Sequence, residues 1–214
     1  MSHPIGEGAR PAAATKAGTA NRWIRIGLGA LVVAVAAQIA IPLPFTPIPF
    51  TLQPLAVLIV GGLLGARAGA AALVLYLGLG LMGLPVFAAG GSGVARLLGP
   101  TGGYLLAFPA AAGLVGWLVE RVGRAGQVGQ ASLAAWPPGR LAALRRLAAY
   151  LVACALGMLV VHIGGTAQLA LLTGDAETAI RSGFIPFLTG DLLKIGLAVA
   201  VLLLALYGDR KSVV

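Results

Sequence analysis

Long apolar stretches follow one another along this chain and predict membrane-spanning helices. A bilayer core about 30 Å thick needs roughly 20 helical residues, and six stretches approach that length, the second being the shortest. They lie at about 23–41, 51–65, 68–87, 104–119, 147–172 and 185–207. The prolines from Pro42 to Pro49 exclude regular helix between the first two, because proline removes a backbone donor and disfavours helix before it. No helix breaker divides the fifth stretch, so we count six spans and not seven.

The polar segments complete the expected domain organisation. We predict a mobile cytoplasmic tail at 1–21, one six-helix membrane domain at 22–208 and a short basic tail at 209–214. A polar connection at about 120–146 contains five arginines and two adjacent prolines, and it is expected on the cytoplasmic side. The first tail does not resemble a cleavable signal peptide, because its charges do not lead into an apolar core.

The basic residues predict the orientation. The chain has 15 Lys and Arg against 6 Asp and Glu, a net charge of +9. With six spans and both termini cytoplasmic, most of the cations fall on the inner side, as the positive-inside rule requires. These inner cations are Arg10, Lys16, Arg22, Arg25, Arg67, Arg121, Arg124, Arg140, Arg145, Arg146, Arg210 and Lys211. The outer loops contain only Arg96 and Arg181. Because the cations lie at span ends and form no continuous face, they do not indicate a nucleic-acid partner.

Composition excludes most other classes of protein. Apolar residues make up 59% of the chain and charged residues only 10%, with a mean hydropathy of +0.97. A soluble domain carries about 25% charged residues. The single cysteine excludes a disulfide scaffold. We therefore expect an all-α integral membrane protein, with six transmembrane helices in one compact bundle, in the inner (cytoplasmic) membrane of the cell.

Asp191 and Lys194 are the strongest candidates for chemistry. Ionisable residues inside a span are costly and are functional by default. At this spacing the two side chains share one helix face and can neutralise each other. A purely structural ion pair is the alternative. The sixth span begins at the outer surface, so we favour a polar ligand site near that surface.

Other polar groups are expected at the same membrane face. The loop at 99–104 has glycines that let backbone amides approach a ligand, and Tyr104 adds a ring and a hydroxyl. Arg96 favours an anionic ligand. Thr51 and Gln53 stand at the outer start of the second span. The glycine-rich segment around Ser92 is interpreted as a lid.

Several motifs favour packing over chemistry. The GxGxxG at 78–83 lies inside a span and lacks the strand-to-helix context of a nucleotide site, so we interpret it as helix packing. Small residues at Ala30 and Ala34 indicate close helix approach, either within the fold or against a partner. Cys154 is expected to be buried, and His162 to donate a hydrogen bond between helices.

No cofactor or metal is expected. No GxxxxGK[ST] loop occurs, so ATP-driven work would need partner subunits. Gly90-Gly91-Ser92-Gly93 resembles the GxSG of rhomboid-type intramembrane serine proteases. Those enzymes use an Asn in the oxyanion site, whereas the only Asn here is Asn21, in the tail.

Four motifs follow one another along the chain: Pro-x-Pro-Phe-Thr with the following Thr51-x-Gln53, Gly83-Leu84-Pro85-Val86-Phe87, Gly99-Pro100-Thr101-Gly102-Gly103-Tyr104, and Gly190-Asp191-x-x-Lys194. In these motifs and their order the chain resembles BioY, the biotin-specific substrate-binding (S) component of energy-coupling-factor (ECF) vitamin transporters. The resemblance covers residues 23 to 207. The third and fourth motifs are the most specific, and Thr189 stands where many members have Pro.

The resemblance implies a protein that is not an enzyme, that captures biotin from outside, and that pairs with a transmembrane coupling subunit and two ATPases, although some members are thought to work alone. It implies docking through Ala30 and Ala34. The ligand-binding set that we expect is Asp191, Lys194, Arg96, Tyr104, Gly103, Thr51, Gln53 and Ser92. Asp191 would accept a ureido N–H, and either Lys194 or Arg96 would pair with the biotin carboxylate.

Three other functions stay open at this point. The chain could be an S component for a different vitamin, because the same bundle serves several ligands. A rhomboid-like protease and a structural membrane subunit are the remaining alternatives.

Overall fold

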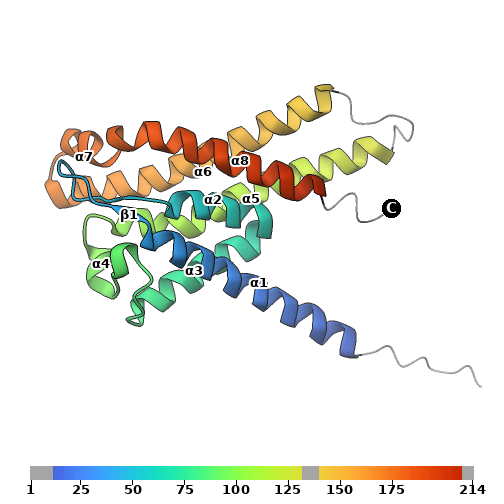
Figure 1. The fold of residues 1–214 in the computed structure, drawn as a ribbon, viewed down its shortest axis with the longest axis horizontal. Helices are drawn as coiled ribbons and strands as arrows, with labels where there is room; N and C mark the ends of the chain where they lie inside the picture. The colour runs from blue at the N-terminus through green and yellow to red at the C-terminus, as the bar shows by residue number, and fades with distance from the viewer. Residues whose placement is uncertain (1–11, 132–139, 209–214) are drawn as a thin grey trace, which may run out of the picture.

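A computed structural model describes residues 12–131 and 140–208 (Figure 1). Its α-helices are α1 (Ala12–Gln38), α2 (Gln53–Leu64), α3 (Ala66–Leu81), α4 (Val94–Leu98), α5 (Gly102–Ala131), α6 (Arg140–Thr173), α7 (Ala176–Gly183) and α8 (Leu188–Gly208). Strands β1 (Ala40–Ile41) and β2 (Phe50–Thr51) form an antiparallel pair that places Ala40 opposite Thr51. Single 3-10 turns occur at η1 (Ala88–Gly90) and η2 (Ile185–Phe187).

The long helices run alongside one another, and the short elements gather at one end of the bundle. Figure 1 shows α4, α7 and the β1–β2 pair at that end, whereas the start of α1 and the finish of α8 lie at the opposite end. We call these the loop end and the terminal end. Within the described residues, four helical segments are long and apolar enough to cross a bilayer, namely 20–38, 102–123, 143–173 and 176–205.

The short helix α2 lies at the centre of the fold. It packs against α1, α3, α5, α6 and α8. Its sequence is apolar on all sides, as expected for a helix that other helices surround. Its 12 residues span only about 18 Å. The non-helical segment 39–52, which contains β1 and β2, leads into its first residue. Non-helical backbone is tolerated at membrane depth where it is buried in protein or lines a cavity.

Glycine makes the close helix contacts possible. A Cβ atom added to Gly61 of α2 would lie 2.5 Å from the carbonyl oxygen of Ala112 on α5. A Cβ at Gly80 would collide with the ring of Phe87, so part of the GxGxxG motif does serve packing, as predicted. Gly78, in the same motif, has nothing within 4 Å of such an atom.

The small residues of α1 also pack inside the fold. Ala30 is 2% exposed and belongs to the main apolar core, and Ala34 packs against that core. Several large apolar residues of α1 are exposed instead, among them Leu28, Leu31 and Val35. Both residues therefore serve internal packing in this chain, and their docking role stays a prediction.

Several predicted boundaries are also corrected. Helix α1 begins at Ala12 and not near 22, because the alanine-rich segment before Trp23 favours helix. Helices α5 and α6 extend into the expected polar connection, which reduces it to 132–139, outside the described residues. The third stretch ends its helix at Leu81, and Gly83 follows with a φ of 97° that residues other than glycine rarely adopt. The tail at 1–11 and the tail at 209–214 also lie outside the described residues.

The amphipathic helix α7 was not anticipated. Asp175 caps it, accepting hydrogen bonds from the hydroxyl and amide of Thr178 and from the amide of Glu177. The same bonds hold the pKa of Asp175 below its usual range. Asp175 is thus an N-cap that stabilises the first turn of α7.

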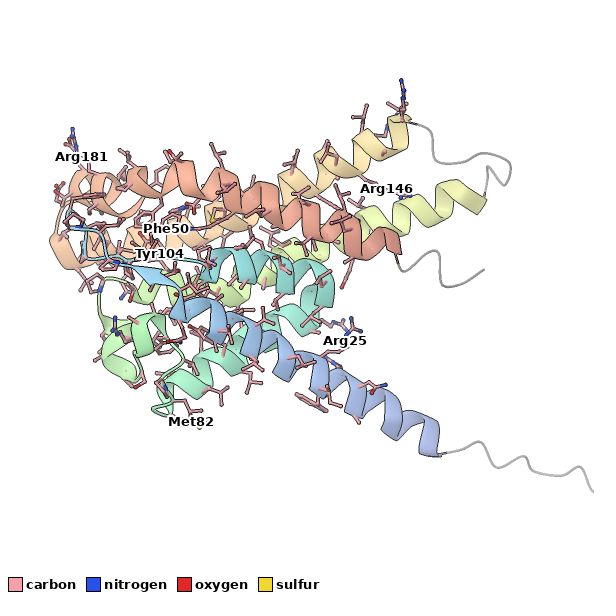
Figure 2. All side chains as sticks on the ribbon, viewed as in Figure 1. Arg25, Phe50, Met82, Tyr104, Arg146 and Arg181 are labelled. Atoms are coloured by element: carbon pink, nitrogen blue, oxygen red, sulfur yellow. The ribbon has the colours of Figure 1, made fainter. Side chains whose placement is uncertain are left out.

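The outer surface is apolar, and the charges separate along the bundle. Large apolar side chains stay exposed on the long helices, for example Leu193 and Leu204 of α8, as expected where a surface faces lipid. Figure 2 shows Arg25 and Arg146 towards the terminal end and Arg181 at the loop end. The charge asymmetry expected from the sequence therefore follows the long axis of the fold.

Two glycine substitutions test the packing of α2. We expect Gly61→Ala to lower the unfolding temperature in detergent by several degrees, because overpacking a core costs about 1–3 kcal/mol. The matched variant Gly78→Ala should leave it unchanged or raise it slightly, since alanine favours helix over glycine by about 1 kcal/mol. Equal unfolding temperatures for the two variants would contradict this packing.

Candidate functional site: a cavity at the loop end

A cavity opens near the loop end, between the first turns of α2, α5 and α8 and the matching part of α6. It contains about 620 Å³ of space between atoms, a figure that includes its open mouth. The residues that line it are Ile48, Pro49, Thr51, Gln53, Pro54, Phe87, Ala88, Arg96, Thr101, Tyr104, Leu105, Phe108, Met158, Val161, His162, Phe187, Asp191 and Lys194. Polar groups from separate segments therefore meet in one mainly apolar pocket.

Asp191, Lys194 and His162 form a buried polar cluster on one wall. The Lys194 ammonium donates to Oδ1 of Asp191 at 2.9 Å, and Nε2 of His162 lies 2.6 Å from Oδ2. All three residues are at most 6% exposed. The i, i+3 spacing of Asp191 and Lys194 predicts that they share a helix face, and the structure shows an ion pair between them. The expected helix-to-helix hydrogen bond of His162 is confirmed, from α6 to α8.

Aromatic rings enclose this cluster. The Lys194 ammonium lies 3.9 Å from the centre of the Phe50 ring, a cation–π contact. Phe50 in turn stacks on Phe187, with ring planes 4° apart. Gly190 lets the Phe50 ring approach, because a Cβ atom there would lie 2.2 Å from it. Phe50 therefore joins the non-helical segment to the start of α8.

Tyr104 supports the cavity from α5. Its hydroxyl donates to the Gly183 carbonyl of α7 at 2.6 Å, and its ring lies where a Cβ of Gly165 would be. Figure 2 shows Tyr104 and Phe50 close to the loop end. The Tyr104 hydroxyl already has an acceptor, so the tyrosine offers its ring to a ligand more readily than its proton.

Gln53 is also partly engaged in structure. Its amide nitrogen lies 2.7 Å from the Tyr76 hydroxyl, which donates to the Val86 carbonyl at 3.0 Å. These bonds connect α2, α3 and the segment that follows α3. Thr51, at 8% exposed, lines the same side of the cavity.

Arg96 is the cavity's unpaired cation. It lies on the short helix α4, and no carboxylate in the described ranges forms an ion pair with it. Gln168 of α6 donates to the carbonyls of Leu97 and Gly99 and so holds the end of α4. The lining residues include two cations and one carboxylate, so with His162 neutral the pocket has a net charge of +1 and favours a monoanion.

The glycine-rich segment is attached to α1. The Gln38 side chain accepts a hydrogen bond from the Gly90 amide at 3.1 Å and donates to the Pro85 carbonyl at 3.4 Å. Ser92 does not line the cavity, and it forms no hydrogen bond with His162. The structure therefore does not assemble the serine–histidine pair that a protease would need.

Comparison with known proteins agrees with this architecture. A sequence model of the BioY family matches residues 10–208. The biotin transporter BioY of Thermotoga maritima is 34% identical over 183 residues, which cover 86% of this chain and 94% of that protein. The biotin transporter BioY2 of Lactococcus lactis is 35% identical, over 79% of this chain and 81% of its own length. The chain belongs to the BioY family.

A solved structure has the same fold as this chain. A crystal structure described as the S-component for biotin from an ECF-type ABC transporter superposes with a TM-score of 0.72. The two share 23% identity, over 91% of this chain and 93% of that one. At this identity the superposition establishes the shared fold of the bundle.

In this BioY-family chain, most of the expected ligand residues meet in the cavity, but two do not. Thr51, Gln53, Arg96, Tyr104, Asp191 and Lys194 line it. Gly103 instead packs on α6, where its Cβ would lie 2.1 Å from the Gly164 carbonyl oxygen, and Ser92 lies outside. His162 and Phe187 were missed as lining residues. A polar residue inside an apolar span was the signal available for His162, but its partner could not be read from spacing.

The ion pair can be tested for stability without any ligand. We expect Asp191→Asn alone to be strongly destabilising, because removing one partner of a buried pair costs about 3–5 kcal/mol. Adding Lys194→Met should recover much of that loss, since the buried ammonium is then gone and an Asn side chain still accepts from His162. Thermal unfolding in detergent measures both. If the double variant is less stable than Asp191→Asn, the two charges do not compensate each other.

Proposed function

We propose that this chain captures biotin from outside the cell and serves its uptake across the inner membrane, as the S component of an ECF-type transporter. The observation that carries the proposal is the cavity, in which a neutral hydrogen-bonding cluster and a separate unpaired cation stand on mainly apolar walls. The relatives named above as biotin transporters support the choice of ligand.

The ureido ring of biotin suits the buried cluster. It carries two N–H donors and one carbonyl. Each carboxylate oxygen of Asp191 accepts one hydrogen bond from a side chain, and a carboxylate has acceptor capacity beyond that. Asp191 therefore accepts a hydrogen bond from a ureido N–H, and Lys194 donates a hydrogen bond to the ureido oxygen. Charge-assisted bonds of this kind are stronger than neutral ones.

The valerate carboxylate suits Arg96. Lys194 is already bonded to Asp191 and covered by Phe50, whereas Arg96 has no carboxylate partner in the described residues. A carboxylate there neutralises the pocket's net charge of +1. Of the two cations that the sequence left as alternatives, the geometry therefore favours Arg96 for the carboxylate.

The apolar part of biotin fits the remaining walls. The thiophane ring and the valerate chain have few polar atoms, and Tyr104, Phe187 and Met158 are among the lining side chains. Burial of such surface contributes about 25 cal/mol per Å². The polar contacts then fix the orientation of the ligand, as in most small-molecule sites.

The membrane arrangement that we propose has six spans, formed by α1, α2, α3, α5, α6 and α8, with both termini cytoplasmic and the cavity facing outside. Support comes from the cations at the terminal end and from Trp23 and Trp117, exposed near that end, as expected in an interfacial belt. Arg121 stacks on Trp117 at 3.9 Å. The terminal tails and the 120–146 region would then face the cytoplasm.

We further propose a transmembrane coupling subunit and two ATPase subunits as partners. The chain has no GxxxxGK[ST] loop, so energy for transport must come from other proteins unless the chain works alone. We propose no enzymatic activity.

Calorimetric titration in detergent tests the ligand, with thiamin and riboflavin as competing vitamins. We expect biotin alone to bind, at one site per chain. Arg96→Gln should weaken biotin about 10-fold to 100-fold, because a hydrogen bond to a charged group contributes about 1.5–3 kcal/mol. The same variant should change the affinity for biotin amide little, since that analogue lacks the carboxylate.

Arg181→Gln is the matched control. Arg181 is the other cation at the loop end, but it is exposed and pairs with Glu177 on α7, outside the cavity. Biotin affinity should be unchanged in this variant. Binding of another vitamin in place of biotin would overturn the ligand, and equal losses for biotin and its amide would overturn the role of Arg96.

A further inference from the structure

His162 has one nitrogen that the fold leaves unpaired. Among the described residues, its Nδ1 is the only buried side-chain nitrogen or oxygen without a hydrogen-bond partner. The ring is held edge-on by Phe184 at 4.8 Å and by Tyr104 at 6.2 Å between ring centres. These aromatic neighbours offer Nδ1 no polar partner, so a proton placed there would be a buried donor without an acceptor.

The other nitrogen of His162 has a strong partner. Nε2 lies 2.6 Å from Oδ2 of Asp191, an oxygen that can only accept while the carboxylate is ionised. Asp191 of α8 is the charged group bonded to the ring, Lys194 of α8 pairs with the other oxygen of Asp191, and Tyr104 of α5 is the titratable ring neighbour. The cheapest arrangement therefore puts the proton on Nε2 and leaves Nδ1 bare, with the cluster of three side chains neutral.

We propose that His162 is a positioning residue for ligand recognition: from α6 it fixes the carboxylate of Asp191 so that its remaining acceptor sites select a ligand N–H. The inference rests on the proposed biotin function and deepens it. Lys194 binds Oδ1 from the same helix, so it cannot by itself restrain Asp191 relative to α6. His162 is the contact that crosses between the two helices.

This role makes a specific prediction about selectivity. With Asp191 held by both neighbours, a ligand that presents an N–H gains a well-aligned bond, and one that presents a methyl group at that place gains none. Without the bond from α6 the carboxylate can turn, and the advantage of the N–H shrinks. If His162 were merely structural, its replacement would lower the affinity for all ligands to the same extent.

The first test compares biotin with its two ureido N-methyl isomers in calorimetric titrations. His162→Phe keeps a ring of similar size but removes the donor, and we expect it to reduce the preference for biotin over the more strongly rejected isomer by about 10-fold or more. His162→Gln retains an N–H donor and should restore most of that preference. An unchanged preference in His162→Phe would overturn the positioning role.

A second measurement needs no variant at the site. Nitrogen NMR of the ¹⁵N-histidine-labelled protein, with His3→Gln leaving His162 as the only histidine, should show a proton on Nε2 and none on Nδ1. A proton on Nδ1 would overturn the inference even if His162→Phe fails to fold.

The two proposals fail separately. Wild-type protein that does not bind biotin overturns the proposed function itself. Wild-type protein that binds biotin, together with a variant that keeps its preference for the free ureido N–H, overturns only the role of His162. Thr166→Val serves as the control on the same helix, because the Thr166 hydroxyl bonds the His162 carbonyl and not its ring. The preference of the Thr166→Val variant for biotin over the N-methyl isomers should match that of the wild type.

Discussion

The buried pair of Asp191 and Lys194 is the interaction on which the site depends. A charged side chain buried without a partner is costly, and Asp191 and Lys194 neutralise each other. Their bond removes the net charge while leaving polar atoms able to meet a ligand. His162 completes the cluster from α6, and Phe50 covers the ammonium. In the function that we propose, this neutralised pair is the surface that recognises the ligand.

The rest of the fold can be understood as what holds this cluster beside an open cavity. Small residues bring the helices close, as Gly61 does between α2 and α5. The shortness of α2 leaves room at the loop end, where the non-helical segment 39–52 brings Thr51 to the cavity and Phe50 over the Lys194 ammonium. Tyr104 ties α5 to α7. Rigid helices therefore provide the deep wall, and short elements provide the mouth.

Much of the architecture could be predicted from the sequence, for reasons of length and polarity. Apolar stretches located the long helices, and the i, i+3 spacing of Asp191 and Lys194 placed them on one face. What could not be predicted depended on contacts between distant segments. By sequence, Ala30 and Ala34 fit a partner face and the core equally well, and the packing of α1 is what shows them against the core of this chain. Gly103 was assigned to the ligand, but α6 occupies its open side. The partner of His162 lies 29 residues away, beyond any local pattern, and α7 was too short and polar to stand out among the spans.

A structure of the protein with biotin bound tests the central claim most directly. The account predicts a ureido nitrogen within hydrogen-bond distance of Asp191, with the ligand carboxylate at Arg96 and His162 still bonded to Asp191. Biotin bound with its carboxylate at Lys194, or bound outside this cavity, would contradict it.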